Sequence, residues 1–142
     1  MKRILSLVAM SSLFLVSCAE RNETAVTSAG EPEAKSILRD VGAEEAAEMI
    51  SSREDLVILD IRTPQEFAEG HIAGAVNIDY RGDDFAEKVG ALDPDKAYLF
   101  HCRSGGRSGD SIPLLKELGF SELYHLNSGI LGWGEAGQSL QK

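Results

Sequence analysis

Short apolar runs, separated by segments with a helical pattern, are the feature that most constrains the fold of this 142-residue chain. The clearest run is Leu56-Val57-Ile58-Leu59, in which no polar residue interrupts the apolar side chains. Continuous runs of this kind are typical of parallel strands that are buried on both faces. Strands that alternate with helices predict a parallel sheet with helices covering both of its faces.

The same pattern extends from residue 36 to the C-terminus. The predicted strands are 37–38, 56–59, 75–78, 97–100 and 123–126, and the predicted helices are 42–52, a short helix capped by Thr63, 83–90, 112–118 and 129–136. We therefore expect a three-layer α/β/α domain around a five-stranded, mainly parallel sheet. Pro113 should either kink the fourth helix or open a new helix after a first turn that ends near Asp110.

The N-terminal segment has a different character. Lys2 and Arg3 precede an apolar run from Ile4 to Val16, which is too short to span a bilayer but is typical of an export signal. The run ends in Leu-Val-Ser-Cys at Cys18 and is similar to a bacterial lipobox, in which the cysteine is lipidated and becomes the first residue. The alternative is an ordinary secretory signal that happens to contain a cysteine.

We expect residues 1–17 to be a lipoprotein signal peptide, residues 18–35 a lipidated cysteine with a flexible tether, and residues 36–142 the folded domain. The protein would then be an exported bacterial lipoprotein of the cell envelope, on the periplasmic face of a membrane. Its formal net charge of −9, without a basic run, argues against nucleic acid as a partner. It also argues against electrostatic binding to anionic lipid, so the lipid anchor itself would hold the protein.

The segment around Cys102 carries the strongest chemical signal. If Cys18 is lipidated, Cys102 is the only thiol left, and a lone thiol in an exported protein is a candidate reactive group. Gly105 and Gly106 let the backbone curl so that N–H groups point at one centre, and a helix N-terminus with two nearby arginines adds positive charge. These features predict a lowered thiol pKa, which an inert structural cysteine would not need.

Three motifs resemble those of rhodanese-like sulfurtransferases. Residues 102–108, Cys-Arg-Ser-Gly-Gly-Arg-Ser, resemble the family's active-site loop, in which Cys is followed by Arg-x-Gly-x-Arg and then Ser or Thr. Residues 60–75 resemble the signature near the start of the domain, and residues 129–133 resemble the one near its end. The last motif departs from the family pattern, because Ser128 stands where a first glycine is usual.

The resemblance implies transfer of sulfane sulfur, from a donor such as thiosulfate to a thiol or cyanide acceptor, through a persulfide on Cys102. The implied partners are a small anionic sulfur donor and an acceptor that is either a small thiol or cyanide or a protein. The resemblance implies no metal or organic cofactor. Cys102 would be catalytic, and the substrate-binding residues would be Arg103, Ser104, Gly105, Gly106, Arg107 and Ser108. Structural roles near the site are expected for Asp60, Arg62, Glu66 and His71. The three histidines show no metal-ligand spacing.

The length of the active-site loop distinguishes sulfur transfer from the chemistry of related cysteine phosphatases and arsenate reductases. Related cysteine phosphatases and arsenate reductases have five residues between the cysteine and the arginine, whereas four separate Cys102 from Arg107. The shorter loop makes a smaller cradle, which suits the terminal sulfur of a persulfide. Two alternatives stay open. The first is a persulfide carrier or binding module with little turnover of its own. The second is an arsenate reductase or phosphatase-like enzyme, which the four-residue spacing and the lack of a resolving cysteine disfavour.

The remaining candidates have plainer interpretations. Because side chains alternate along a strand, His101 should point away from the face that Cys102 presents, in a packing or hydrogen-bonding role. His71 should bond neighbouring backbone, and Trp133 should anchor the last helix in the core. His125 lies at a strand end and carries no motif.

Overall fold

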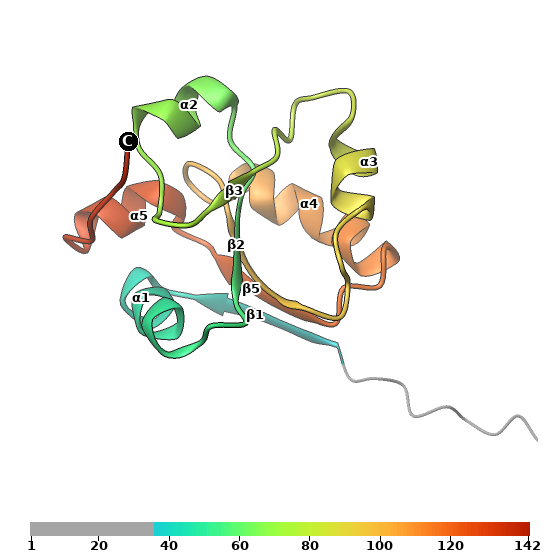
Figure 1. Cartoon of the computed structure of the whole chain (residues 1–142), viewed down its shortest axis with the longest axis horizontal. Helices are drawn as coiled ribbons and strands as arrows, with labels where there is room; N and C mark the ends of the chain where they lie inside the picture. Colours follow the sequence, from blue (N-terminus) through green and yellow to red (C-terminus); the bar gives the residue numbers. More distant parts are fainter. Residues whose placement is uncertain (1–35) are drawn as a thin grey trace, which may run out of the picture. The chain divides into compact units, whose positions relative to one another are not determined.

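The computed structural model describes residues 36–142, in which strands and helices alternate along the chain (Figure 1). The strands are β1 (Ile37–Val41), β2 (Val57–Asp60), β3 (Val76–Asn77), β4 (Ala97–His101) and β5 (Glu122–Leu126). The helices are α1 (Ala43–Ser52), α2 (Pro64–Glu69), α3 (Phe85–Gly90), α4 (Gly106–Glu117) and α5 (Gly129–Glu135). Each strand is followed by a helix, as the apolar pattern predicts.

The strands form one sheet in the order β1-β5-β4-β2-β3, and all neighbouring strands are parallel. The predicted α/β fold is therefore confirmed, with a sheet that is wholly rather than mainly parallel. All five residues of the central strand β4 are buried. In open parallel sheets ligands bind beyond the carboxyl ends of the strands, and Cys102 follows the carboxyl end of β4 directly.

The sheet separates two apolar cores because successive strand side chains point to opposite faces. Leu99 of β4 belongs to the core that Trp133 of α5 completes, and the neighbouring Phe100 belongs to the core that Leu115 of α4 completes. Figure 1 shows α1 and α5 on one side of the sheet and α3 and α4 on the other. Cys102 belongs to the second core, so its sulfur lies on the α4 side.

Helix α4 runs without interruption from Gly106 to Glu117. Of the two outcomes expected at Pro113, the one in which this residue opens a new helix is therefore wrong. Pro113 is exposed, while Ser108, Ser111 and Leu115 are buried. Water can bind the carbonyl that proline leaves without its helical partner, and the packing of the buried side outweighs the local cost of proline.

Helix α2 begins as its sequence predicts. The Thr63 hydroxyl accepts a hydrogen bond from the Glu66 backbone N–H at 3.3 Å, and the Glu66 carboxylate accepts one from the Thr63 N–H at 3.1 Å. This reciprocal capping box occupies two N–H groups that the first helical turn would otherwise leave unpaired. It also fixes the position of the Glu66 carboxylate at the N-terminus of α2.

The expected signal peptide, Cys18 and the tether to residue 35 lie outside the described residues. Within residues 36–142, every helix is too short or too polar to traverse a bilayer.

Candidate active site

The sulfur of Cys102 lies inside a tight loop that joins β4 to α4. Cys102 is 1% exposed, and its Sγ accepts hydrogen bonds from the Gly105 N–H at 3.2 Å and from the Ser108 hydroxyl at 3.4 Å. Gly105 has a φ of +90°, a conformation that glycine adopts without strain. The loop therefore turns its backbone donors inward toward the sulfur, as the two glycines predict.

Two glycines let the loops after β4 and β5 meet backbone to backbone. A Cβ on Gly105 would lie 1.9 Å from the carbonyl oxygen of Asn127, and one on Gly129 would lie 2.4 Å from the carbonyl oxygen of Arg103. Gly129 also has a φ of +60°, whereas Ser128 has a φ of −83°. The turn therefore needs only one glycine, which explains why serine is accepted at position 128.

The pKa of the Cys102 thiol lies below its ordinary value. Burial by itself raises this pKa, but the Ser108 hydroxyl and the N–H groups of Ser108, Ser104 and Gly105 together outweigh that effect. Hydrogen bonds to a thiolate favour the charged form over the neutral thiol. The sulfur is therefore prepared as a nucleophile by its own loop.

The two arginines of the loop have different surroundings. Arg107 donates to both carboxylate oxygens of Glu66, at 2.8 and 2.7 Å, and this pairing holds the pKa of Glu66 at about 2. Arg103 is exposed and makes no ion pair with any carboxylate of residues 36–142. Sequence reasoning expected both cations to act on Cys102. In the structure Arg107 pairs with Glu66 and also interacts electrostatically with the Cys102 sulfur, whereas Arg103 presents its charge to solvent.

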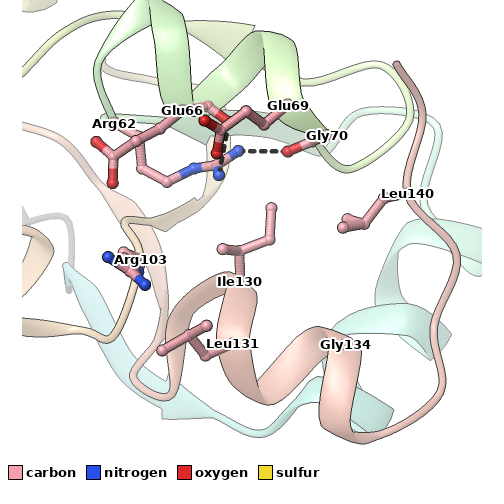
Figure 2. A pocket seen from close by; sticks show the side chains of 9 residues that line it. All are labelled: Arg62, Glu66, Glu69, Gly70, Arg103, Ile130, Leu131, Gly134 and Leu140. Carbon is pink, nitrogen blue, oxygen red and sulfur yellow. Dashed lines mark hydrogen bonds between the residues drawn. The ribbon is translucent and has the colours of Figure 1, made fainter.

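A buried ion pair lies beneath the loop. The Arg62 guanidinium donates to Asp60 at 2.6 and 3.0 Å, and it also binds the carbonyl oxygens of Glu66 and Gly70 at 3.0 and 2.8 Å (Figure 2). Asp60 is fully buried and Arg62 is 5% exposed. The guanidinium therefore ties β2 to the first turn and the C-cap of α2 and so supports the position of Glu66.

Neither histidine near the Cys102 motif contacts the sulfur. His101 Nδ1 lies 3.0 Å from the Cys102 carbonyl oxygen, on the other side of the strand from Sγ. Its Nε2 is buried without a hydrogen-bond partner, 3.8 Å from Asp60, and burial lowers the pKa of this imidazole. His71 Nδ1 lies 3.1 Å from the carbonyl oxygen of Phe67, whose ring it stacks on at 3.8 Å.

A third histidine, which the sequence did not single out, does belong to the site. His125 Nε2 lies 2.8 Å from the Ser108 hydroxyl oxygen, and Nδ1 lies 2.9 Å from Oδ1 of Asp40. One signal could have found it. Alternation along β5 places His125 on the same face as Leu123, which is the face that α4 covers.

A cavity of about 410 Å³ opens beside the loop (Figure 2). Arg103 forms one part of its wall, and Ile130, Leu131 and Leu140 supply apolar side chains. Backbone N–H groups of Ile130 and Leu131 donate to the carbonyl oxygens of Cys102 and Arg103, at 3.0 and 3.1 Å. The start of α5 is thereby fixed against the loop, with one exposed cation above an apolar surface.

Comparison with known proteins identifies the family. Residues 42–136 match the family model described as the rhodanese-like domain. This chain belongs to the rhodanese-like family. The matched residues include all three sequence motifs and Cys102, which directly follows the central strand β4.

Individual relatives agree with the family match. YtwF of Bacillus subtilis is 38% identical over 96 residues, which cover 68% of this chain and 90% of YtwF. A protein of Allochromatium vinosum named sulfurtransferase is 27% identical over 101 residues, covering 71% of this chain and 92% of the relative. The crystal structure of a rhodanese-related protein from Thermoplasma volcanium superposes with a TM-score of 0.63 at 31% identity, covering 72% and 97% of the two chains. These similarities support a sulfurtransferase-like role.

Proposed function

We propose that this rhodanese-like domain moves sulfane sulfur from thiosulfate, or a donor like it, to a thiol or cyanide acceptor through a persulfide on Cys102. One observation carries the proposal: the buried sulfur is hydrogen-bonded by the N–H of Gly105 and the hydroxyl of Ser108, inside a loop with four residues between Cys102 and Arg107. Such a cradle favours a thiolate.

The reaction has two half-reactions. The Cys102 thiolate attacks the outer sulfur of thiosulfate, the S–S bond of the donor breaks, and sulfite leaves with the bonding electron pair. The acceptor nucleophile then attacks the outer sulfur of the persulfide, and the Cys102 thiolate leaves. The donors that stabilise the thiolate, at Ser104, Gly105 and Ser108, would also stabilise the persulfide anion.

The arginines have distinct proposed roles. Arg103 is exposed at the wall of the cavity, where its charge would attract an anionic donor. Arg107 is bound by Glu66 and would hold the loop in shape rather than bind the donor directly. The apolar residues Ile130 and Leu131 would face the organic part of a thiol acceptor.

The test compares two activities on one sample of the purified protein. We expect sulfur transfer from thiosulfate to cyanide and no hydrolysis of aryl phosphates. Cys102→Ser should abolish the transfer, because serine forms no persulfide. If phosphate-ester hydrolysis is the faster reaction, the proposed function is wrong and the phosphatase-like alternative holds.

The carrier alternative needs a separate measurement. Thiosulfate treatment should add ~32 Da, one sulfur atom, to the Cys102 peptide. A catalyst loses this mass when a thiol or cyanide is added and regains it with more donor. A persulfide that forms but is not turned over by small acceptors would favour the carrier function.

We also propose that the protein is an exported lipoprotein whose Cys18 carries the lipid. The basic start, the apolar run from Ile4 to Val16 and the position of Cys18 support this proposal.

A further inference from the structure

A chain of hydrogen-bond contacts runs from the buried sulfur of Cys102 to the surface of β1. The Ser108 hydroxyl lies 3.4 Å from Sγ, His125 Nε2 lies 2.8 Å from that hydroxyl, and Asp40 Oδ1 lies 2.9 Å from His125 Nδ1. Cys102 is 1% exposed, whereas the Asp40 side chain is 62% exposed. The contacts therefore join a sulfur that is shielded from water to a carboxylate in contact with water.

The chemistry of these groups determines where protons reside. The Asp40 carboxylate only accepts, so a hydrogen lies on His125 Nδ1. When Nε2 carries no hydrogen, it can accept the single Ser108 hydroxyl hydrogen, which otherwise points to Cys102 Sγ. The Ser108 oxygen can then accept the S–H of Cys102. The Gly105 carbonyl oxygen, 3.1 Å from the same hydroxyl, is a competing acceptor for its hydrogen and also accepts the Gly109 N–H at 2.8 Å.

We propose that Ser108, His125 and Asp40 form a proton relay for Cys102. As the thiolate forms, the Cys102 proton passes to the Ser108 oxygen while the Ser108 hydroxyl proton passes to His125 Nε2. The products are a thiolate and an imidazolium, so the total charge along the chain is unchanged. Ser108 then donates to the thiolate, and the Asp40 carboxylate stabilises the imidazolium. His125 acts through Ser108 and is a positioning residue.

The surroundings of His125 leave few other partners for its proton. Asp40 faces the imidazole from β1 and Ser108 faces it from α4, while the Phe100 ring of β4 stacks on it with centroids 5.0 Å apart. Among the described residues, no other titratable side chain lies within hydrogen-bond or ion-pair distance of this ring. His125 itself is 6% exposed, so water has little access to it.

The relay deepens the proposed sulfur transfer, and thiol alkylation tests it without any sulfur donor. Iodoacetamide reaction of the purified full chain is followed against pH, and peptide mass spectrometry separates Cys102 from Cys18. For His125→Gln we expect alkylation about tenfold slower near pH 6, which corresponds to a thiol pKa about one unit higher. Asp40→Asn should act in the same direction but less strongly.

Two matched variants control for charge and packing. Glu45→Gln removes a carboxylate that pairs with Arg39 beside β1, and Ser111→Ala removes a buried α4 hydroxyl that bonds the Ser108 carbonyl oxygen. Neither side chain contacts the side chains of Ser108, His125 or Asp40, so both variants should keep the alkylation profile of the unmodified protein.

A double-mutant cycle separates a relay from a merely structural histidine. Ser108→Ala removes the hydroxyl that links His125 to Cys102, so adding His125→Gln to this variant should not slow alkylation further. Adding His125→Gln to Ser111→Ala should slow alkylation as much as it does in the unmodified sequence. An unchanged profile in His125→Gln, or an equal effect with and without Ser108, would overturn the relay.

A measurement on the unmodified sequence covers the case in which a variant fails to fold. Imidazole nitrogen resonances are followed against pH before and after alkylation of Cys102. The His125 curve should change and the His71 curve should not, and an unchanged His125 curve contradicts the relay. If the alkylation results hold while sulfur transfer is absent, the proposed function fails and the relay stands.

Discussion

Glu66 and Arg107, which are 41 residues apart in sequence, meet through two hydrogen bonds of 2.8 and 2.7 Å. The pair connects the start of α2 to the first turn of α4, and the side chains are 25% and 17% exposed. Planar, two-point pairing of this kind is stronger and more directional than an ordinary surface ion pair. It ties the start of α4, directly after the active-site loop, to α2.

The first prediction concerns the stability that this ion pair supplies. Glu66→Gln should lower the free energy of unfolding by about 1–2 kcal/mol near neutral pH, measured by denaturant titration. The folded-state pKa of Glu66 is depressed to about 2 by Arg107. Its contribution is therefore present above the unfolded pKa of about 4.3 and is lost as pH falls through about 2.

The difference between the two proteins should shrink steadily between about pH 5 and pH 2. Glu45→Gln is the control, because its partner pair with Arg39 is largely exposed and should contribute less. A Glu66→Gln deficit that is constant across this pH range would mean that charge is not its cause.

The second prediction compares adjacent glycines. Gly105→Ala should destabilise the fold by about 2–4 kcal/mol, because its Cβ would meet the Asn127 carbonyl oxygen and its φ is positive. Gly106→Ala should change stability by less than about 1 kcal/mol, since no atom lies within 4 Å of its Cβ position. Thermal unfolding of both variants is the measurement, and equal losses would contradict the close backbone approach.

The third prediction separates the two arginines. Arg103→Ala should raise the KM for thiosulfate about three- to tenfold and leave the free energy of unfolding unchanged, since this side chain is exposed. Arg107→Ala should lower the free energy of unfolding, because Glu66 loses its partner. Steady-state kinetics and denaturant titration of both variants give the answer. The reverse assignment of effects would show that Arg107 binds the donor.

The fourth prediction tests loop length. One glycine inserted after Gly106 gives five residues between Cys102 and Arg107, and it should slow sulfur transfer by about tenfold or more. The inserted residue moves the Gly105 and Ser108 donors relative to Sγ. The same insertion after Gly137 at the end of α5 is the control. Equal rates in both insertion variants would show that loop length does not decide the chemistry.

The fifth prediction tests the proposed anchor. Cys18→Ala should prevent incorporation of a radioactive fatty acid and leave the chain unprocessed or unanchored. Labelling of bacterial cells that express either form is the measurement. Equal label in the two proteins would rule out Cys18 as the lipidated residue.

Much of the fold was predictable because it is encoded locally. Apolar runs such as Leu56–Leu59 predicted the strands, Thr63 and Glu66 predicted the capped start of α2, and the glycines after Cys102 predicted a tight loop. The sequence left two outcomes open at Pro113, a kinked helix or a new helix, and the structure excludes the second. Proline disfavours a helix locally, but the buried side of α4 supplies packing that a local pattern does not contain.

The sequence by itself determined the order of strands and helices, the position of Cys102 at the end of a buried strand, and the glycines that its loop requires. Only the tertiary structure decided which groups surround the sulfur. Asp40 and His125 meet because β1 and β5 pair in parallel with these two residues in register, 85 positions apart. Glu66 takes up Arg107 because the sheet brings α2 beside α4. Such contacts depend on strand order and register, which short-range sequence patterns do not specify.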